Sequence, residues 1–342
     1  MNKKVTIYDI AREAGVSTAT VTRVFRKDPR VKEATRLKVQ KVIDAYAYTP
    51  SVSAQHLEGG RSGTLAVVLP VVSNLYFNRI FDAAYWEAEA NGCSLRLFQT
   101  MENQAISPDI VSELIRCRMD GVLFAGSIWS ADRGDLNTAL EKLGKYMPVA
   151  TICPPDVQLD CICIQSDLVN CSRLPVRHLH TLGHRRIAFI HGEMTSVTQK
   201  RLASFKKTCA ALGLEIPPEY VRPAVFHDPR SSGLQTRALL ALPKRPTCIL
   251  YPDDLSFLGG MSELERHGLS IPGDISVAGY DGIPLSQILR PRLSTYRQAG
   301  EEMGREAARL LIEQIEQPDV WLPQQITVAG ELLPGDTVAN IG

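Results

Sequence analysis

The sequence predicts a small all-α head followed by an α/β core of two lobes, each built on a doubly wound parallel sheet. Residues 6–46 carry apolar residues at helical spacing between capping signals. From residue 64 onward, short and continuous apolar runs alternate with amphipathic stretches, which is typical of parallel strands and the helices that cover them. Alternating strands and helices over about 280 residues are more than a single hydrophobic core usually holds, so two lobes are expected.

The head is predicted to hold three helices and a short extension. Thr6 caps the first helix, and Asp9 completes a capping box three residues later. Gly15 stands where a left-handed residue ends a helix, and Ser17 caps the second helix. The third helix carries an apolar stripe of Val39, Val42, Ile43 and Tyr46. Residues 51–58 suit one further short helix, and the glycine-rich residues 59–63 suit a flexible joint.

The core follows as strands and helices in alternation. Strands are predicted at 64–70, 95–98, 121–125, 149–153, 187–191, 248–251 and 275–279. Helices are predicted at 77–91, 107–117, 135–144, 169–182, 199–212, 232–242 and 255–267. The expected domains are 1–49 (head), 50–62 (hinge helix and linker) and 63–342 (core), with one lobe at about 63–163 plus 293–323 and the other at 164–290 plus 324–342. Since ligands bind beyond the carboxyl ends of parallel strands, the cleft between the lobes is the expected pocket.

Composition and charge restrict the function classes. Hydrophobic residues make up 44% of the 342 residues and charged residues 22%, which excludes a disordered or collagen-like chain. Residues 1–61 carry a net charge of +6 and the remainder −5, so a polyanionic partner is expected for the head alone. There is no signal-like apolar region after the N-terminus and no run of about 18 apolar residues. The eight cysteines suit reduced thiols, and a cytoplasmic protein without a membrane partner is expected.

The pattern around Gly15 is typical of a helix-turn-helix. It has a small residue at Ala11, a turn residue at Gly15, and apolar residues at Val16, Val21 and Val24. The second helix then presents short hydroxyl side chains and Arg23, which suit phosphates and guanine. The alternative is a plain three-helix bundle with a solvated basic face.

The chain resembles the lac repressor (LacI/GalR) family of bacterial transcription regulators. The resemblance rests on residues 6–17, 22–24, 31–50, 73–77, 119–122, 178–190, 201–205, 272–281 and 290–295, in that order along the chain. It implies a periplasmic-binding-protein-like core and a homodimer whose two heads bind a near-palindromic operator. Leucine heptads like those that tetramerise some relatives are absent from the sequence, so a dimer is expected.

The same resemblance implies which residues contact DNA. Thr18 and Ala19 match the main base-reading positions, where Ala19 offers only a methyl group. Thr22, Arg23 and Arg26 flank them, and the positions that touch the DNA backbone are Tyr8, Ser17, Thr20, Arg30 and Thr35. Residues 51–58 match the hinge helix, in which Ala54 is a DNA contact and Leu57 matches a leucine wedged into the minor groove. Gln55 and Glu58 replace the usual arginine pair, and Leu57 could instead be a simple linker residue.

The effector site implied by the resemblance lies in the cleft. Its residues are Asn74, Tyr76, Phe77, Arg201, Asp228, Asp253, Asp281 and Gln298. The alternatives are lobe packing for the aromatics, a surface charge for Arg201 and a turn aspartate for Asp281. Asp254 is expected to cap the following helix. Several acids with one arginine favour a neutral or cationic polyhydroxylated ligand, so a sugar is favoured, and a nucleoside or a purine remains open.

The sequence lacks the common motifs of enzymes and cofactor sites. Dinucleotide, P-loop, zinc-protease, serine-hydrolase and C-x-x-C motifs are absent from the sequence, so neither an enzyme nor a cofactor is expected. Cys161 and Cys163 point to the same face of one strand, and His178 and His180 to different sides of a helix. Neither set completes a metal site, and buried thiols are expected. A ligand-binding protein or sugar-active enzyme with an unused head is the alternative class.

Overall fold

The computed structural model describes residues 5–25, 28–46, 48, 61–100, 108–126, 133–152 and 160–342. The chain divides into two compact units, Met1–Gly63 and Thr64–Gly342. Within the described ranges, none of the helices combines the length and the apolar character needed to cross a bilayer. The same ranges hold no cluster of three or more potential metal-ligating side chains.

The first unit is the predicted three-helix head, with α1 at Ile7–Glu13, α2 at Thr18–Phe25 and α3 at Glu33–Ala45. Its core is small, and Ile10, Val21 and Val39 are fully buried at its centre. The predicted capping box is present, because Thr6 and Asp9 each accept a hydrogen bond from the other's backbone N–H. Gly15 has a φ of 59°, the left-handed conformation that the turn requires.

Thr6→Ala should loosen the start of α1. The substitution removes one side-chain acceptor of the capping box and should cost about 1 kcal/mol, within the usual range for such caps. Amide hydrogen exchange in α1 should then quicken about fivefold. Glu13→Ala, at an exposed position of the same helix, should leave the exchange rates nearly unchanged. Equal effects of the two substitutions would contradict a capping role.

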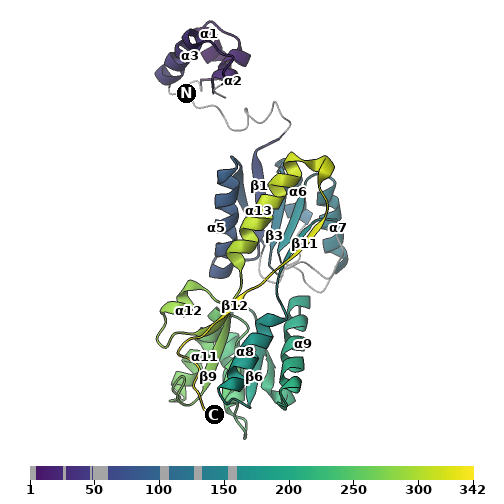
Figure 1. Ribbon diagram of the computed structural model, residues 1–342, viewed down its shortest axis with the longest axis vertical. Helices are drawn as coiled ribbons and strands as arrows, with labels where there is room; N and C mark the ends of the chain where they lie inside the picture. The colour runs from purple at the N-terminus through teal and green to yellow at the C-terminus, as the bar shows by residue number, and fades with distance from the viewer. Residues whose placement is uncertain are drawn as a thin grey trace. The chain divides into compact units, whose positions relative to one another are not determined.

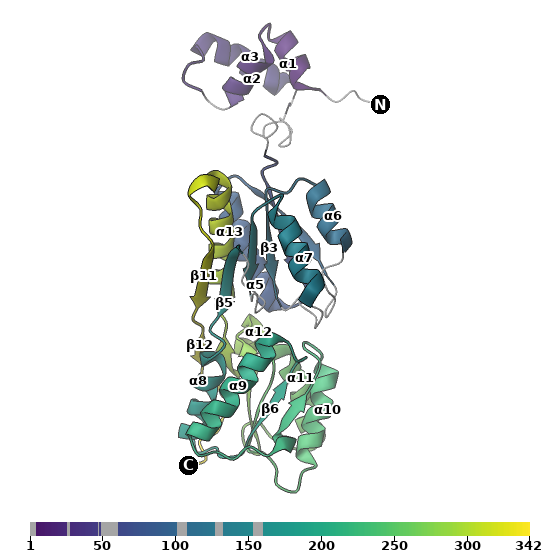
Figure 2. The same cartoon turned by 90° about the vertical axis from the view of Figure 1, so that its right-hand side faces the viewer.

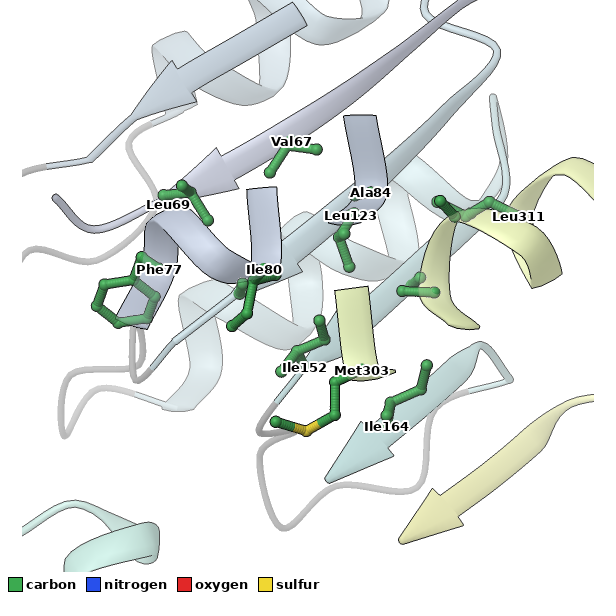
Figure 3. Packing of buried hydrophobic residues seen from close by; sticks show 14 of the residues in the cluster. Val67, Leu69, Phe77, Ile80, Ala84, Leu123, Ile152, Ile164, Met303 and Leu311 are labelled. Carbon is green, nitrogen blue, oxygen red and sulfur yellow. The ribbon is translucent and has the colours of Figure 1, made fainter. Parts of the chain in front are cut away.

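The first lobe of the second unit is built on a six-stranded parallel sheet in the order β11-β5-β4-β3-β1-β2. Its strands are β1 (Thr64–Leu69), β2 (Ser94–Gln99), β3 (Gly121–Ala125), β4 (Val149–Ile152), β5 (Ile162–Ser166) and β11 (Gln324–Val328). One face packs against α5 (Leu75–Ala90) and α13 (Gly300–Glu316), which lie side by side (Figure 1). Figure 3 shows this core, where Ile80 and Met303 meet the sheet residues. The other face packs against α6 (Pro108–Arg116) and α7 (Arg133–Gly144).

The second lobe has a six-stranded sheet in the order β12-β10-β9-β8-β6-β7, in which only β12 is antiparallel to its neighbour. Its strands are β6 (Ile187–His191), β7 (Val221–Pro223), β8 (Cys248–Leu250), β9 (Ser276–Asp281), β10 (Ser294–Arg297) and β12 (Glu331–Leu333). The helices are α8 (Asn170–Thr181), α9 (Ser196–Ala211), α10 (Pro229–Leu240), α11 (Asp254–Arg266) and the short α12 (Pro284–Ile288). As Figure 2 shows, α8 and α9 lie to one side of the sheet and α10 and α11 to the other.

The predicted lobe boundaries are wrong at two strands. Residues 294–297 form β10, which pairs with β9 in the second lobe, whereas residues 324–328 form β11, which pairs with β5 in the first lobe. Only α12 separates β9 from β10, so β10 stays in the same sheet. The chain then returns to the first lobe through α13, a helix that was not predicted, and crosses a last time between β11 and β12.

Candidate effector cleft and DNA-binding surface

A cleft lies between the two lobes, at the carboxyl ends of their strands. The space between its walls is about 710 Å³ when the open mouth is included. Tyr76 and Phe77 line it from the start of α5, Asp253 follows β8, and Asp281 ends β9. The remaining lining residues are Pro70, Gly126, Val197, Arg201, Phe226, His227, Pro252, Tyr280 and Gln298. The cleft therefore has aromatic walls and a small set of polar groups.

A chain of hydrogen bonds links the two lobes across one side of the cleft. The Tyr76 hydroxyl donates to Gln298 Oε1 over 3.3 Å, and Gln298 Nε2 donates to Asp281 Oδ1 over 2.7 Å. All three side chains are buried. Asp281 has a φ of 103°, which is costly for a residue with a Cβ, so the surrounding contacts must hold it in place. Such strain is concentrated at ligand sites.

Arg201 is the buried cation of the cleft. It extends from α9, its Nη1 donates to the carbonyl of Pro252 over 3.0 Å, and its guanidinium lies 3.6 Å from the ring centroid of Tyr280. Its Nε is buried and has no hydrogen-bond partner. A buried N–H without an acceptor is costly. A ligand oxygen in the cleft would satisfy this Nε and remove that cost.

His227 closes the cleft on its other side. Asn74 Nδ2, from the first lobe, lies 3.0 Å and 3.1 Å from the two ring nitrogens of His227, and the His227 backbone N–H donates to Asp253. Asn74 Oδ1 also caps α5 by accepting from the Tyr76 N–H. His227 has a φ of 57°, so two of the three non-glycine residues with positive φ in the described ranges line this cleft.

The three buried carboxyl groups at the site, those of Asp253, Asp254 and Asp281, differ in pKa. Burial and the nearby Asp253 charge raise the pKa of Asp281 to about 7. Burial opposes ionisation of Asp253 as well, but hydrogen bonds and charge from His227 and bonds from Ser256 hold its pKa below its ordinary value. Burial and the charge of Asp281 place the pKa of Asp254 well above its ordinary value. Asp253 is thus the carboxylate that stays ionised.

Asp281→Asn should reduce the fall of stability with rising pH, although the raised pKa of Asp254 keeps part of that fall. The folded protein keeps the proton of Asp281 up to about pH 7, whereas the unfolded chain loses it near the ordinary pKa of 3.8. The free energy of unfolding of the wild type should therefore fall as pH rises from about 4 to 7, by up to about 4 kcal/mol. Urea unfolding between pH 5 and 7.5 measures this. Asp274→Asn, at a surface carboxyl of lowered pKa, should keep the wild-type slope.

The structure corrects two sequence expectations at this site. Asp228 does not line the cleft, because its carboxylate caps α10 by accepting from the Arg230 N–H. Asp254 is not the cap of α11, since Asp253 accepts the Ser256 N–H and Asp254 instead bonds Thr295 and the Ile283 N–H. Tyr76, Phe77, Arg201, Asp253, Asp281 and Gln298 come together in the cleft, and Asn74 contacts it through His227.

Sequence reasoning missed His227, Phe226 and Tyr280. His227 directly precedes Asp228, the residue expected in the cleft, and the Asp228-Pro229 pair is itself a helix-start signal. The helix-start signal assigns Asp228 to the cap of α10, and the cleft residue is the preceding His227. Tyr280 directly precedes Asp281, and the guanidinium of Arg201 packs over its ring.

The head presents the predicted DNA-binding residues on its surface. Val21 and Val24 face the core of the head, which leaves Ala19 and Arg23 exposed on the other side of α2. Thr18, Thr20, Thr22 and Thr35 are half-buried, while Ser17, Arg30 and Tyr8 are exposed, Tyr8 by 74%. Ser17 caps α2 by accepting from the Thr20 N–H. The Thr22 hydroxyl donates to the carbonyl of Thr18.

Arg30 is not available as a free cation. Its guanidinium binds both carboxylate oxygens of Asp28, and this bond lowers the pKa of Asp28 to about 2. A phosphate contact by Arg30 would have to share or replace Asp28. Within the described ranges, Arg23 has no such partner. Arg26, Ala54, Leu57, Gln55 and Glu58 lie outside the described residues, as does the expected hinge helix at 51–58.

Comparisons with known proteins agree with both parts of the chain. Residues 6–51 match the family of bacterial regulatory proteins of the lacI type, and residues 176–338 match a periplasmic binding protein-like domain. The HTH-type transcriptional repressor PurR of Mannheimia succiniciproducens is 31% identical over 315 residues, covering 92% of this chain and 93% of the relative. The chain belongs to the LacI family.

Other members of the LacI family are similar over nearly the whole length. The HTH-type transcriptional repressor CytR of Escherichia coli is 28% identical and covers 98% of this chain and 96% of that protein. The lac repressor dimer bound to operator and the anti-inducer ONPF is similar in structure, with a TM-score of 0.83, 26% identity, and coverage of 98% of this chain and all of that one. This LacI-family chain is therefore a transcription regulator and not an enzyme.

Proposed function

We propose that this regulator is a repressor that binds a near-palindromic operator as a homodimer and is controlled by a small molecule in the cleft. The observation that carries the proposal is the cleft itself, which is lined by a buried arginine with an unsatisfied Nε, by strained Asp281 and by ionised Asp253. A site built and strained in this way suits a specific ligand. The half-buried hydroxyl side chains of α2, with exposed Ala19 and Arg23, supply the base-reading surface.

The ligand of the cleft is a neutral polyhydroxylated molecule, a sugar in preference to a nucleoside or purine. Carboxylates and amides such as Asp253, Asp281 and Gln298 accept and donate hydrogen bonds to hydroxyl groups, and the faces of Tyr76 and Phe77 suit a sugar ring. Ionised Asp253 balances the guanidinium of Arg201, and Asp281 adds negative charge as it ionises near pH 7, so the cleft disfavours a strongly anionic ligand. A free sugar should therefore bind more tightly than its phosphate ester.

DNA binding is tested with the whole chain and with a form that starts at Ser62. The whole chain should shift the DNA upstream of its own coding region, and its affinity should fall steeply with salt because bound Lys and Arg displace counterions from phosphates. The form that starts at Ser62 should not bind. Equal binding by both forms, or salt-insensitive binding, would contradict the operator-binding function.

The ligand is tested by a thermal-shift screen against sugars, sugar phosphates, nucleosides and purines. A ligand at 100 times its Kd adds about 2.7 kcal/mol of stability, which raises the melting temperature by a few degrees. A hit among free sugars is expected. Tighter binding of a sugar phosphate than of its parent sugar would overturn the ligand assignment and leave the DNA-binding assignment standing. Light scattering should give a dimer, and a stable tetramer would contradict that part.

A further inference from the structure

Two cysteines lie in contact in the first lobe, away from the cleft. Cys163 lies in β5 and Cys161 immediately precedes that strand, so both side chains point to the sheet face covered by α6 and α7. Their Sγ atoms are 3.5 Å apart. Both residues are free thiols. At this separation, a small movement of the two side chains would allow a disulfide bond to form.

The two thiols differ in their chemistry. A hydrogen bond joins the two sulfurs, in which either can be the donor, and the Thr151 hydroxyl donates to the Cys163 sulfur over 3.7 Å; these bonds hold the pKa of Cys163 below its ordinary value. The same contact, together with burial, raises the pKa of Cys161. The bond from Thr151 favours Cys163 as the member of the pair that ionises first. The thiolate is the nucleophilic form of cysteine.

Small molecules have a route to the pair. Cys161 lines a hollow of about 740 Å³ whose wall also includes Tyr146, Asp160 and Gln314. The two cysteines are 6% and 8% exposed, whereas Cys248 on β8 is fully buried. Hydrogen peroxide is small enough to enter the hollow beside Cys161, and a protein-sized reactant is not.

We propose that Cys161 and Cys163 form a reversible disulfide in response to hydrogen peroxide. The Cys163 thiolate attacks one peroxide oxygen, the S–O bond forms and the O–O bond breaks, and the leaving hydroxide takes a proton to become water. The Cys161 sulfur then attacks the sulfur of the Cys163 sulfenic acid. The S–S bond forms, the S–O bond breaks, and the Cys161 proton leaves with the hydroxide as water. Two thiols are oxidised by two electrons, and one peroxide is reduced to two waters.

Strand geometry makes this disulfide labile. Two residues of an extended strand span about 6.6 Å between Cα atoms, close to the upper limit of about 6.8 Å for disulfides, whose usual value is about 5.5–6 Å. Cys161 lies in the bend just before β5, so the bond requires the chain to contract at the start of the strand and should be readily reduced. β5 pairs with β4 and β11 and ends at Ser166, just before the first crossing into the second lobe. The inference does not depend on the proposed function.

The whole chain is treated with hydrogen peroxide at pH 7, blocked with an alkylating agent and mapped by mass spectrometry. The expected product is 2 Da lighter, carries the link between Cys161 and Cys163, and returns to the starting mass with dithiothreitol. A disulfide that joins Cys161 to Cys153, or oxidation confined to the half-buried Cys93 and Cys117, would overturn the proposal.

Single variants test the order of the two steps. In Cys161→Ser, the sulfenic acid should persist at Cys163 and be trapped by dimedone, whereas Cys163→Ser should give no dimedone adduct at Cys161. Cys209→Ser, which removes a buried thiol on α9, should form the disulfide as the wild type does. A dimedone adduct at Cys161 in Cys163→Ser would contradict the assigned roles. The mapping of the wild type remains decisive if a variant fails to fold.

Discussion

Arg201→Ala is expected to weaken effector binding by about 10- to 150-fold. Arg201 is the guanidinium that lines the cleft, and its buried Nε has no acceptor in the structure. A hydrogen bond from a charged donor contributes about 1.5–3 kcal/mol, which corresponds to this loss. Calorimetric titration with the effector found in the thermal screen measures it. Operator binding without effector should stay within about twofold of the wild type.

Two further variants distinguish a ligand contact from a packing role. Arg201→Lys keeps the charge but loses the planar fork, so its affinity should lie between those of the wild type and Arg201→Ala. Lys207→Ala removes an exposed cation from the same helix and should leave the affinity unchanged. Wild-type effector affinity in Arg201→Ala would show that Arg201 only supports Tyr280 and Pro252.

Arg23→Ala is expected to lower operator affinity by about 1–3 kcal/mol, or about 5- to 150-fold, and to relax the preference at one base pair. Arg23 is exposed on α2 beside the hydroxyl side chains of the reading surface. Fluorescence anisotropy with the operator and with point variants of it measures both effects. Arg12→Ala removes the same charge from α1, where Arg12 pairs with Asp9, and should cost much less. An equal loss in both variants would reduce Arg23 to a general electrostatic contribution.

The sequence predicts the individual strands and helices of this fold better than it predicts which sheet each strand joins. All seven predicted strands of the core are present, because continuous apolar runs such as 121–125 match fully buried parallel strands. The seven predicted helices of the core are present within a few residues of their limits. What periodicity does not encode is which sheet a strand joins. For β10 and β11 that depends on where α13 packs, and α13 packs against α5, more than 200 residues earlier in the chain.

The site shows the same limit on a smaller scale. Arg201, Asp253, Asp281 and the aromatics of α5 were predicted from a resemblance, and they share one cleft because strand ends meet there. The Asp253–Asp254 pair could not be resolved from sequence. The cap belongs to the residue with extended backbone, and Asp253 has φ −159° and ψ 168°. Asp254 is then the first residue of α11, and its carboxylate accepts from Thr295 and the Ile283 N–H.

Effector binding in the cleft and operator binding by the head should be allosterically coupled within this protein. The direct test is to measure operator affinity with and without saturating effector, and effector affinity with and without saturating operator. Coupling requires both affinities to change by the same factor, typically 5- to 150-fold for allosteric proteins. The account predicts this equality, with the form starting at Ser62 keeping its effector affinity when operator is added. Operator affinity that stays the same at saturating effector would contradict the account.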